Sequence, residues 1–83
     1  MSNTNINYRV DGDIHSIDVA PNETVLRLNN RIRGNFPFDF DLYYNDIPRG
    51  IEKYMNPENL VSVYINLETL VATDTHIIVR RKT

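Results

Sequence analysis

An Asp-Gly pair set between two runs of alternating side chains constrains the fold more than any other feature of this chain. Residues 5–10 alternate apolar and polar side chains, which is typical of a strand with one buried face. Residues 14–20 form a second such run. Asp11-Gly12-Asp13 lies between them, and glycine tolerates the positive φ of a tight turn. The sequence therefore predicts an antiparallel hairpin at the start of the chain.

A single helix is predicted after the hairpin. Thr24 is suited to cap it, because its hydroxyl can accept a hydrogen bond from a first-turn amide. Val25, Leu28 and Ile32 then recur with the spacing of one apolar helical stripe. Gly34 is expected to end the helix in the left-handed conformation.

The rest of the chain is expected to supply further strands. Residues 38–44 alternate again, and residues 75–81 have the dense apolar middle of a central strand. Residues 47–50 are interpreted as a short edge strand, since they include a proline that cannot donate within a central ladder. Residues 60–71 fit both a strand and a helix, and their β-branched side chains favour a strand or irregular structure. We therefore expect an α+β roll with a mixed sheet of four or five strands packed on one helix.

Length and composition narrow the class of protein. The 83 residues are enough for one domain, residues 1–83, with an ordered core of about residues 5–81. The chain has no cysteine, which excludes disulfides, thiolate zinc sites, cysteine nucleophiles and thioester-forming conjugating enzymes. No long apolar run and no signal-peptide pattern is visible, so we expect a cytoplasmic protein with no membrane contact.

Charged residues give little reason to expect a nucleic-acid partner. Nine basic and eleven acidic side chains leave a net charge of −2. Arg27, Arg31 and Arg33 crowd the predicted helix, and we interpret them as solvated surface charge. A small nucleic-acid binder is therefore the third choice of function.

No set of residues indicates catalysis or metal binding. His15 and His76 are the chain's two histidines, have no partners in a zinc motif, and are interpreted as exposed strand residues. Asp39 and Asp41 share one strand face, where charges usually serve solvation and protect an edge. Three isolated glycines cannot build a phosphate loop. We expect no enzyme activity, no cofactor and no metal site.

Four segments together suggest a family. They are residues 17–25 (IDVAPNETV), 41–44 (DLYY), 59–65 (NLVSVYI) and 75–81 (THIIVRR). In this order the chain resembles the β-grasp fold of ubiquitin-like proteins across about residues 5 to 81. The stretch after Gly50 is longer than its ubiquitin equivalent, which implies an insertion or an extra strand and is similar to divergent bacterial ubiquitin-like proteins. The resemblance implies fold more than function.

The resemblance also implies a recognition surface on the sheet face opposite the helix. The outward residues of the third and last strands in this family form that surface, and here they include Tyr43, His76, Ile78 and Arg80, with Arg49 nearby. An exposed isoleucine and tyrosine rimmed by arginine suits protein docking. The alternative is that residues 60–70 fold over this face and bury it.

The leading functional hypothesis is a small ubiquitin-like interaction module or adaptor that binds a protein partner through this sheet-face patch. The alternative is a protein modifier or sulfur carrier, which needs an atypical or processed C-terminal tail because Arg81, Lys82 and Thr83 stand where such proteins carry Gly-Gly. Self-association through a strand edge is a further expectation that stays open.

Overall fold

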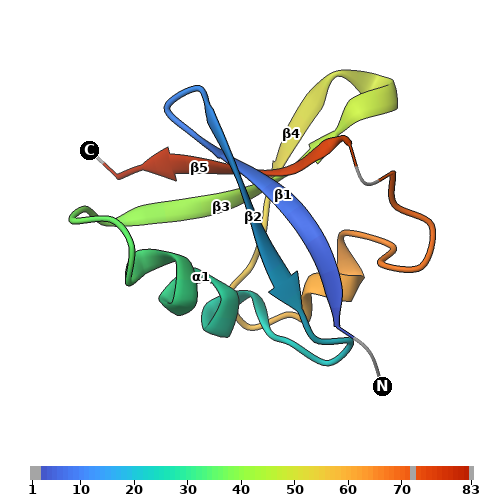
Figure 1. Cartoon of the computed structure of the whole chain (residues 1–83), viewed down its shortest axis with the longest axis horizontal. Coiled ribbons are helices and arrows are strands. Elements are labelled where there is room, and N and C mark those ends of the chain that lie inside the picture. The colour runs from blue at the N-terminus through green and yellow to red at the C-terminus, as the bar shows by residue number, and fades with distance from the viewer. Residues whose placement is uncertain (1–2, 72, 83) are drawn as a thin grey trace.

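The computed structural model describes residues 3–71 and 73–82 and has an α+β fold, in which one α-helix lies against a five-stranded mixed sheet (Figure 1). The strand order is β2-β1-β5-β3-β4, and β1 and β5 are parallel while the other neighbours are antiparallel. The predicted α+β class, mixed sheet and single helix are confirmed. The elements are β1 (Thr4–Val10), β2 (Asp13–Val19), α1 (Val25–Arg33), β3 (Phe40–Asp46), the 3₁₀ helix η1 (Ile47–Arg49), β4 (Ile51–Tyr54), the 3₁₀ helix η2 (Val61–Val63) and β5 (Thr75–Arg81).

The predicted hairpin is confirmed. Val10 pairs with Asp13, which leaves a loop of Asp11 and Gly12. Their φ angles are 51° and 91°, so both residues take the left-handed conformation that a two-residue hairpin turn needs. The turn thereby matches the right-handed twist of the strands it joins.

The helix begins as predicted but ends differently. The Thr24 hydroxyl accepts a hydrogen bond from the backbone N–H of Arg27 at 3.2 Å. Val25, Leu28 and Ile32 are buried. Gly34 has φ −59° and ψ −18°, so the expected left-handed stop is wrong. The chain instead makes one more right-handed turn, in which the next residue, Asn35, donates to the carbonyl of Ile32 at 3.0 Å.

The edge of the sheet beyond β3 also differs from the prediction. Residues 47–50 are not a strand, because η1 forms there and Gly50 then takes the left-handed conformation with φ 67°. Pro48 lies in the first turn of η1, where a backbone N–H would have no partner within the helix, so its absence costs no hydrogen bond. The edge strand is β4, directly after Gly50. Residues 75–81 form the central strand β5, as predicted.

Residues 55–70 close the core beside the start of the helix. Met55, Val61 and Ile65 are buried in the same cluster as Phe40 and the apolar stripe of α1. The N–H of Val61 donates to the carbonyl of Glu23 at 2.9 Å, which fastens η2 to the loop before the helix. In Figure 1 this orange segment lies beside the start of α1. The segment is irregular with one 3₁₀ turn, and the alternative that residues 60–70 fold over the sheet face opposite the helix does not hold, because Val61 and Ile65 pack in the core with the helix.

An ion pair between an exposed arginine and a buried carboxylate ties β2 to the helix. The Glu23 carboxylate is buried, and it accepts hydrogen bonds from Arg31 at 2.7 Å and from the N–H of Ala20 at 3.1 Å. The same guanidinium donates to the carbonyl of Asp18 at 2.8 Å. One arginine of α1 therefore bonds both to the loop before the helix and to the edge strand β2.

Among the described residues, no helix has the length and the apolar composition that a membrane span requires.

Candidate protein-binding surface

A row of five side chains crosses the sheet on the face opposite α1. The core includes Tyr8, Val10 and Val79, so their neighbours along each strand point to the other face. Strand register places directly opposed residues side by side on that face. We call the five residues the cross-sheet row: Ile14 (β2), Arg9 (β1), Ile78 (β5), Tyr43 (β3) and Tyr54 (β4).

Two of the predicted patch residues are not exposed. Ile78 points away from the helix as expected, but only 5% of Ile78 and 9% of His76 is exposed. Ile78 lies between Arg9 and Tyr43 in the row, which leaves it little contact with water. His76 Nε2 is 2.9 Å from the carbonyl oxygen of Val71, so the loop before β5 covers that ring. The expectation of an exposed isoleucine and an exposed histidine is therefore wrong.

Arg80 forms a two-point ion pair that crosses β3. Its Nη2 and Nε atoms donate to the two carboxylate oxygens of Glu52 at 2.6 and 3.1 Å. β5 and β4 lie on either side of β3, so this pair spans the middle strand on the outer face. Hydrogen bonding to Glu52 and the charge of that carboxylate raise the pKa of Arg80. The two hydrogen bonds to Glu52 orient this guanidinium, which is charged at physiological pH, beside the cross-sheet row.

The tyrosine pair is the accessible apolar part of this face at its β4 edge. The rings of Tyr43 and Tyr54 are 5.7 Å apart at an angle of 67°, which is an edge-to-face contact. Tyr54 is 49% exposed, whereas Tyr43 is half-buried. At the far end of the row, Ile14 is 61% exposed. Aromatic contact area is therefore available at one edge of the sheet, with Arg80 and Glu52 beside it.

Arg49 is not brought together with Arg80. Arg80 pairs with Asp41 in the first half of β3, whereas Arg49 follows Asp46 at the end of that strand. The guanidinium of Arg80 pairs with Glu52, whereas Arg49 is paired with Asp46. Arg49 Nε lies 3.7 Å from an Asp46 carboxylate oxygen.

The pKa of Tyr44, which lies in the same region, is raised above its ordinary value. Burial is the main cause, and the charge of Asp46 and a hydrogen bond to it add to the effect.

The predicted tail residues belong to the fold as far as the structure describes them. Arg81 forms an ion pair with Asp11, and its guanidinium lies 4.0 Å from the centre of the Phe38 ring. The backbone N–H of Lys82 donates to the carbonyl of Asp39 at 3.0 Å. Thr83 lies outside the described residues. The two described tail residues are thus held against the sheet.

Sequence reasoning missed four residues of this surface: Arg9, Ile14, Glu52 and Tyr54. Ile14 stands one step out of the alternation of its strand, which is a local signal that it faces away from the core. Arg9 is a polar neighbour in the alternating first strand, so its face was readable. Glu52 and Tyr54 carry no such signal, because the four residues of β4 show no apolar alternation.

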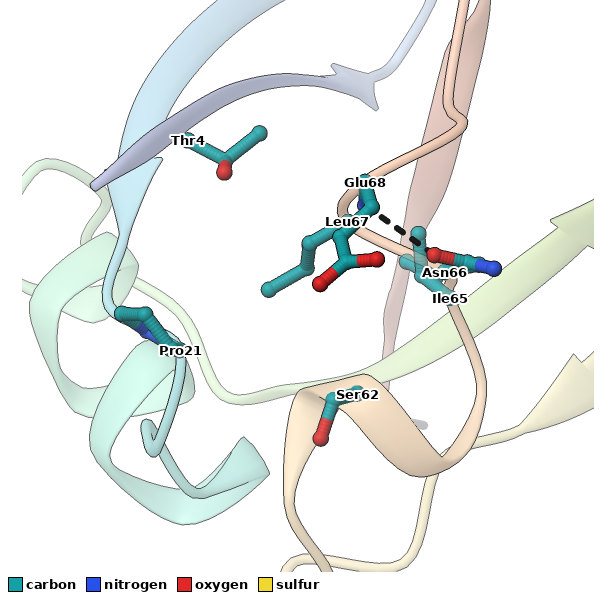
Figure 2. Close-up of a pocket in the computed structure, with 7 residues that line it drawn as sticks. All are labelled: Thr4, Pro21, Ser62, Ile65, Asn66, Leu67 and Glu68. Carbon is teal, nitrogen blue, oxygen red and sulfur yellow. Dashed lines mark hydrogen bonds between the residues drawn. The ribbon is translucent and has the colours of Figure 1, made fainter. Parts of the chain in front are cut away.

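A separate hollow of about 560 Å³ lies at the other end of the molecule, between η2 and the start of β1. Figure 2 shows Leu67 and the Glu68 carboxylate pointing into the space between Thr4, Pro21 and Ser62. Glu68 is the one ionisable side chain among its described lining residues, so the hollow lacks a pair of groups for acid and base. The lining residues are Thr4, Pro21, Ser62, Ile65, Asn66, Leu67 and Glu68.

The remaining candidate residues contact other side chains of the fold. His15 is half-buried, with its ring 5.3 Å from that of Tyr8 and 5.6 Å from that of Phe36, so it is not an exposed strand residue. Asp39 and Asp41 lie 3.5 Å from Arg33 and 3.7 Å from Lys82, respectively. Within residues 3–71 and 73–82 no three acidic or histidine side chains are grouped to hold a metal ion.

Comparison with known proteins adds no family. No protein-family model matches this chain, and no curated protein matches its sequence.

Proposed function

We propose that this protein is a ubiquitin-like β-grasp domain that acts as a protein-interaction module through the outer face of its sheet. The order of its elements supports the fold assignment, since a hairpin, a covering helix and a returning strand parallel to β1 are the features expected of that family. The binding surface differs from the predicted patch. Its centre is the Tyr43–Tyr54 pair, flanked by Arg80 and Glu52, rather than Ile78 and His76.

The exposed tyrosine pair beside an arginine oriented by Glu52 is the observation that carries this proposal. Tyrosine and arginine are enriched among residues that dominate binding energy at protein interfaces. Tyr54 offers a large apolar surface, and its contact with Tyr43 restricts the ring before any partner binds. A ring that is already restricted loses less conformational entropy on binding. The surface is therefore suited to hold a partner without rearrangement.

A pull-down from the native host tests the proposal. The tagged protein and its Tyr54→Ala variant are compared under native and denaturing conditions, and co-eluting proteins are identified by mass. Leu26→Ala is the matched control, because Leu26 is a similarly exposed apolar side chain on the helix. We expect partners that elute only under native conditions, are lost with Tyr54→Ala and are kept with Leu26→Ala. Equal recovery by all three proteins would contradict the proposal.

The same experiment separates the modifier alternative. A modifier or sulfur carrier would give adducts that survive denaturation, whereas an interaction module would not. Ile78→Asp is a poor probe of binding, because Ile78 is buried and a carboxylate there would destabilise the fold. Tyr54 is the better choice since half of its surface is already in water.

A further inference from the structure

The outer edge of β4 is an open strand edge. All four of its residues are exposed, and β4 is the last strand of the sheet. The N–H of Met55 donates to the carbonyl of Leu42 at 3.0 Å. The N–H and C=O groups of successive residues alternate in direction along an antiparallel strand, so the backbone groups of Lys53 and Ile51 also point toward β3. The N–H and C=O groups of Glu52 and Tyr54 therefore face outward, where another strand can bond to them.

Lys53 decides what kind of strand fits this edge. The register in which two copies of β4 pair all the outward groups of Glu52 and Tyr54 bonds Glu52 of each copy to Tyr54 of the other, and it sets Lys53 directly opposite Lys53. Like charges directly opposite each other in a sheet are unfavourable, and an edge lysine commonly prevents self-pairing. Within the described part of the chain, no acidic side chain lies within ion-pair distance of Lys53, so its charge is available to an acidic partner.

We infer that the β4 edge binds an extended segment of a partner protein as a sixth strand, with a carboxylate opposite Lys53 and an apolar side chain beside Tyr54. This inference rests on the proposed function, because the added strand would continue the outer face beside the Tyr43–Tyr54 pair. Backbone bonds to Glu52 and Tyr54 would provide affinity. The alternating side chains of the segment would provide specificity.

Random peptides displayed on phage provide the probe. A library of random peptides about as long as two strands is selected on the wild-type protein, and the selected peptides are synthesised. Their affinities are then measured for Glu52→Pro and Glu52→Ala. Both variants lose the ion pair to Arg80, but only proline removes the outward N–H, and it leaves the bonds to β3 unchanged. We expect Glu52→Pro to bind at least about tenfold more weakly than Glu52→Ala.

Two further measurements on the same peptides keep the inference open to contradiction. Hydrogen exchange at the Glu52 and Tyr54 amides of the wild-type protein should slow when a peptide binds, and this readout does not depend on how the proline variant folds. Selected peptides should carry Asp or Glu, and Lys53→Glu should weaken them at least about tenfold.

Several results would overturn the inference. These are selection of no peptide, equal affinity for Glu52→Pro and Glu52→Ala, or unprotected amides in the complex. Formation of a dimer by the wild-type protein that Glu52→Pro abolishes would show that a second copy is the occupant instead. Peptides that lose affinity with Tyr43→Ala but not with Glu52→Pro would support the proposed function and contradict binding at the β4 edge. Peptides indifferent to Tyr43→Ala, Tyr54→Ala and Glu52→Pro would contradict both.

Discussion

The two edges of this sheet are built differently. At the β2 edge, Arg31 of the helix donates to the outward carbonyl of Asp18, and the same guanidinium is held by the buried carboxylate of Glu23. At the β4 edge, no residue is buried, and the strand is fixed to the core by Met55, which follows its last residue. One edge is closed by a side chain from another element, and the other is open.

The difference follows from where the helix lies. α1 follows β2 directly and runs back across the same side of the sheet, so an arginine in its last turn reaches the β2 backbone. No α-helix directly precedes or follows β4, and the chain leaves it at the buried Met55. An open edge is a risk for aggregation unless it is short or charged, and β4 is four residues long with Lys53 in the middle.

Removing the anchor of β4 should have the largest effect on stability. Met55→Ala deletes most of a side chain that is fully buried, so we expect the free energy of unfolding to fall by about 3 kcal/mol. Denaturant unfolding measures the loss. Met55→Leu keeps the volume and should cost less than about 1.5 kcal/mol. Equal losses for the two variants would mean that packing at Met55 does not hold β4 in place.

Loss of the Arg31 contact at the β2 edge should lower the free energy of unfolding almost as much. Arg31→Ala leaves the buried Glu23 carboxylate without its partner, and we expect a loss of about 2 to 3 kcal/mol in thermal or denaturant unfolding. Arg33→Ala is the control, since Arg33 lies 3.5 Å from the exposed Asp39 and such pairs contribute less than about 1 kcal/mol. A small effect of Arg31→Ala would show that the closed edge does not depend on this ion pair.

A pair of glycine substitutions tests how the chain enters β4. Gly50 has φ 67°, so Gly50→Ala should destabilise the protein by about 1 kcal/mol even though there is space for the methyl group. Gly34 is right-handed, and a methyl there would meet only ordinary contact with the Arg31 carbonyl at 3.5 Å, so Gly34→Ala should be neutral or slightly stabilising. Melting temperatures of the two variants should therefore move in different directions or by clearly different amounts.

Breaking the ion pair beside the open edge should have the smallest effect on stability. Arg80→Gln removes the contact with Glu52, but both side chains are partly in water, so the loss should be below about 1 kcal/mol. Denaturant unfolding of the variant and the wild-type protein measures this loss. A large loss of stability would mean that the pair holds the outer face together rather than presenting it.

Much of the fold was predictable because its signals are local. The Asp-Gly turn needs only the conformational freedom of two residues. The Thr24 cap and the apolar stripe of α1 depend only on residues within a few turns of one helix. The end of the helix and the position of β4 were not predictable in this way. Gly34 takes a right-handed conformation and residues 47–50 form a 3₁₀ turn, although both sequences also suit the structures that were expected.

The candidate site shows the same division. The sequence by itself determined which residues of the central strands face away from the core, since alternation decides the face of Tyr43 and Ile78. The tertiary structure alone decided which of them a partner can reach. Ile78 is covered because Arg9 and Tyr43 come from other strands to flank it, and Tyr54 is exposed because β4 ends the sheet. Alternation is a property of one strand, whereas exposure depends on side chains from strands that are distant in the sequence.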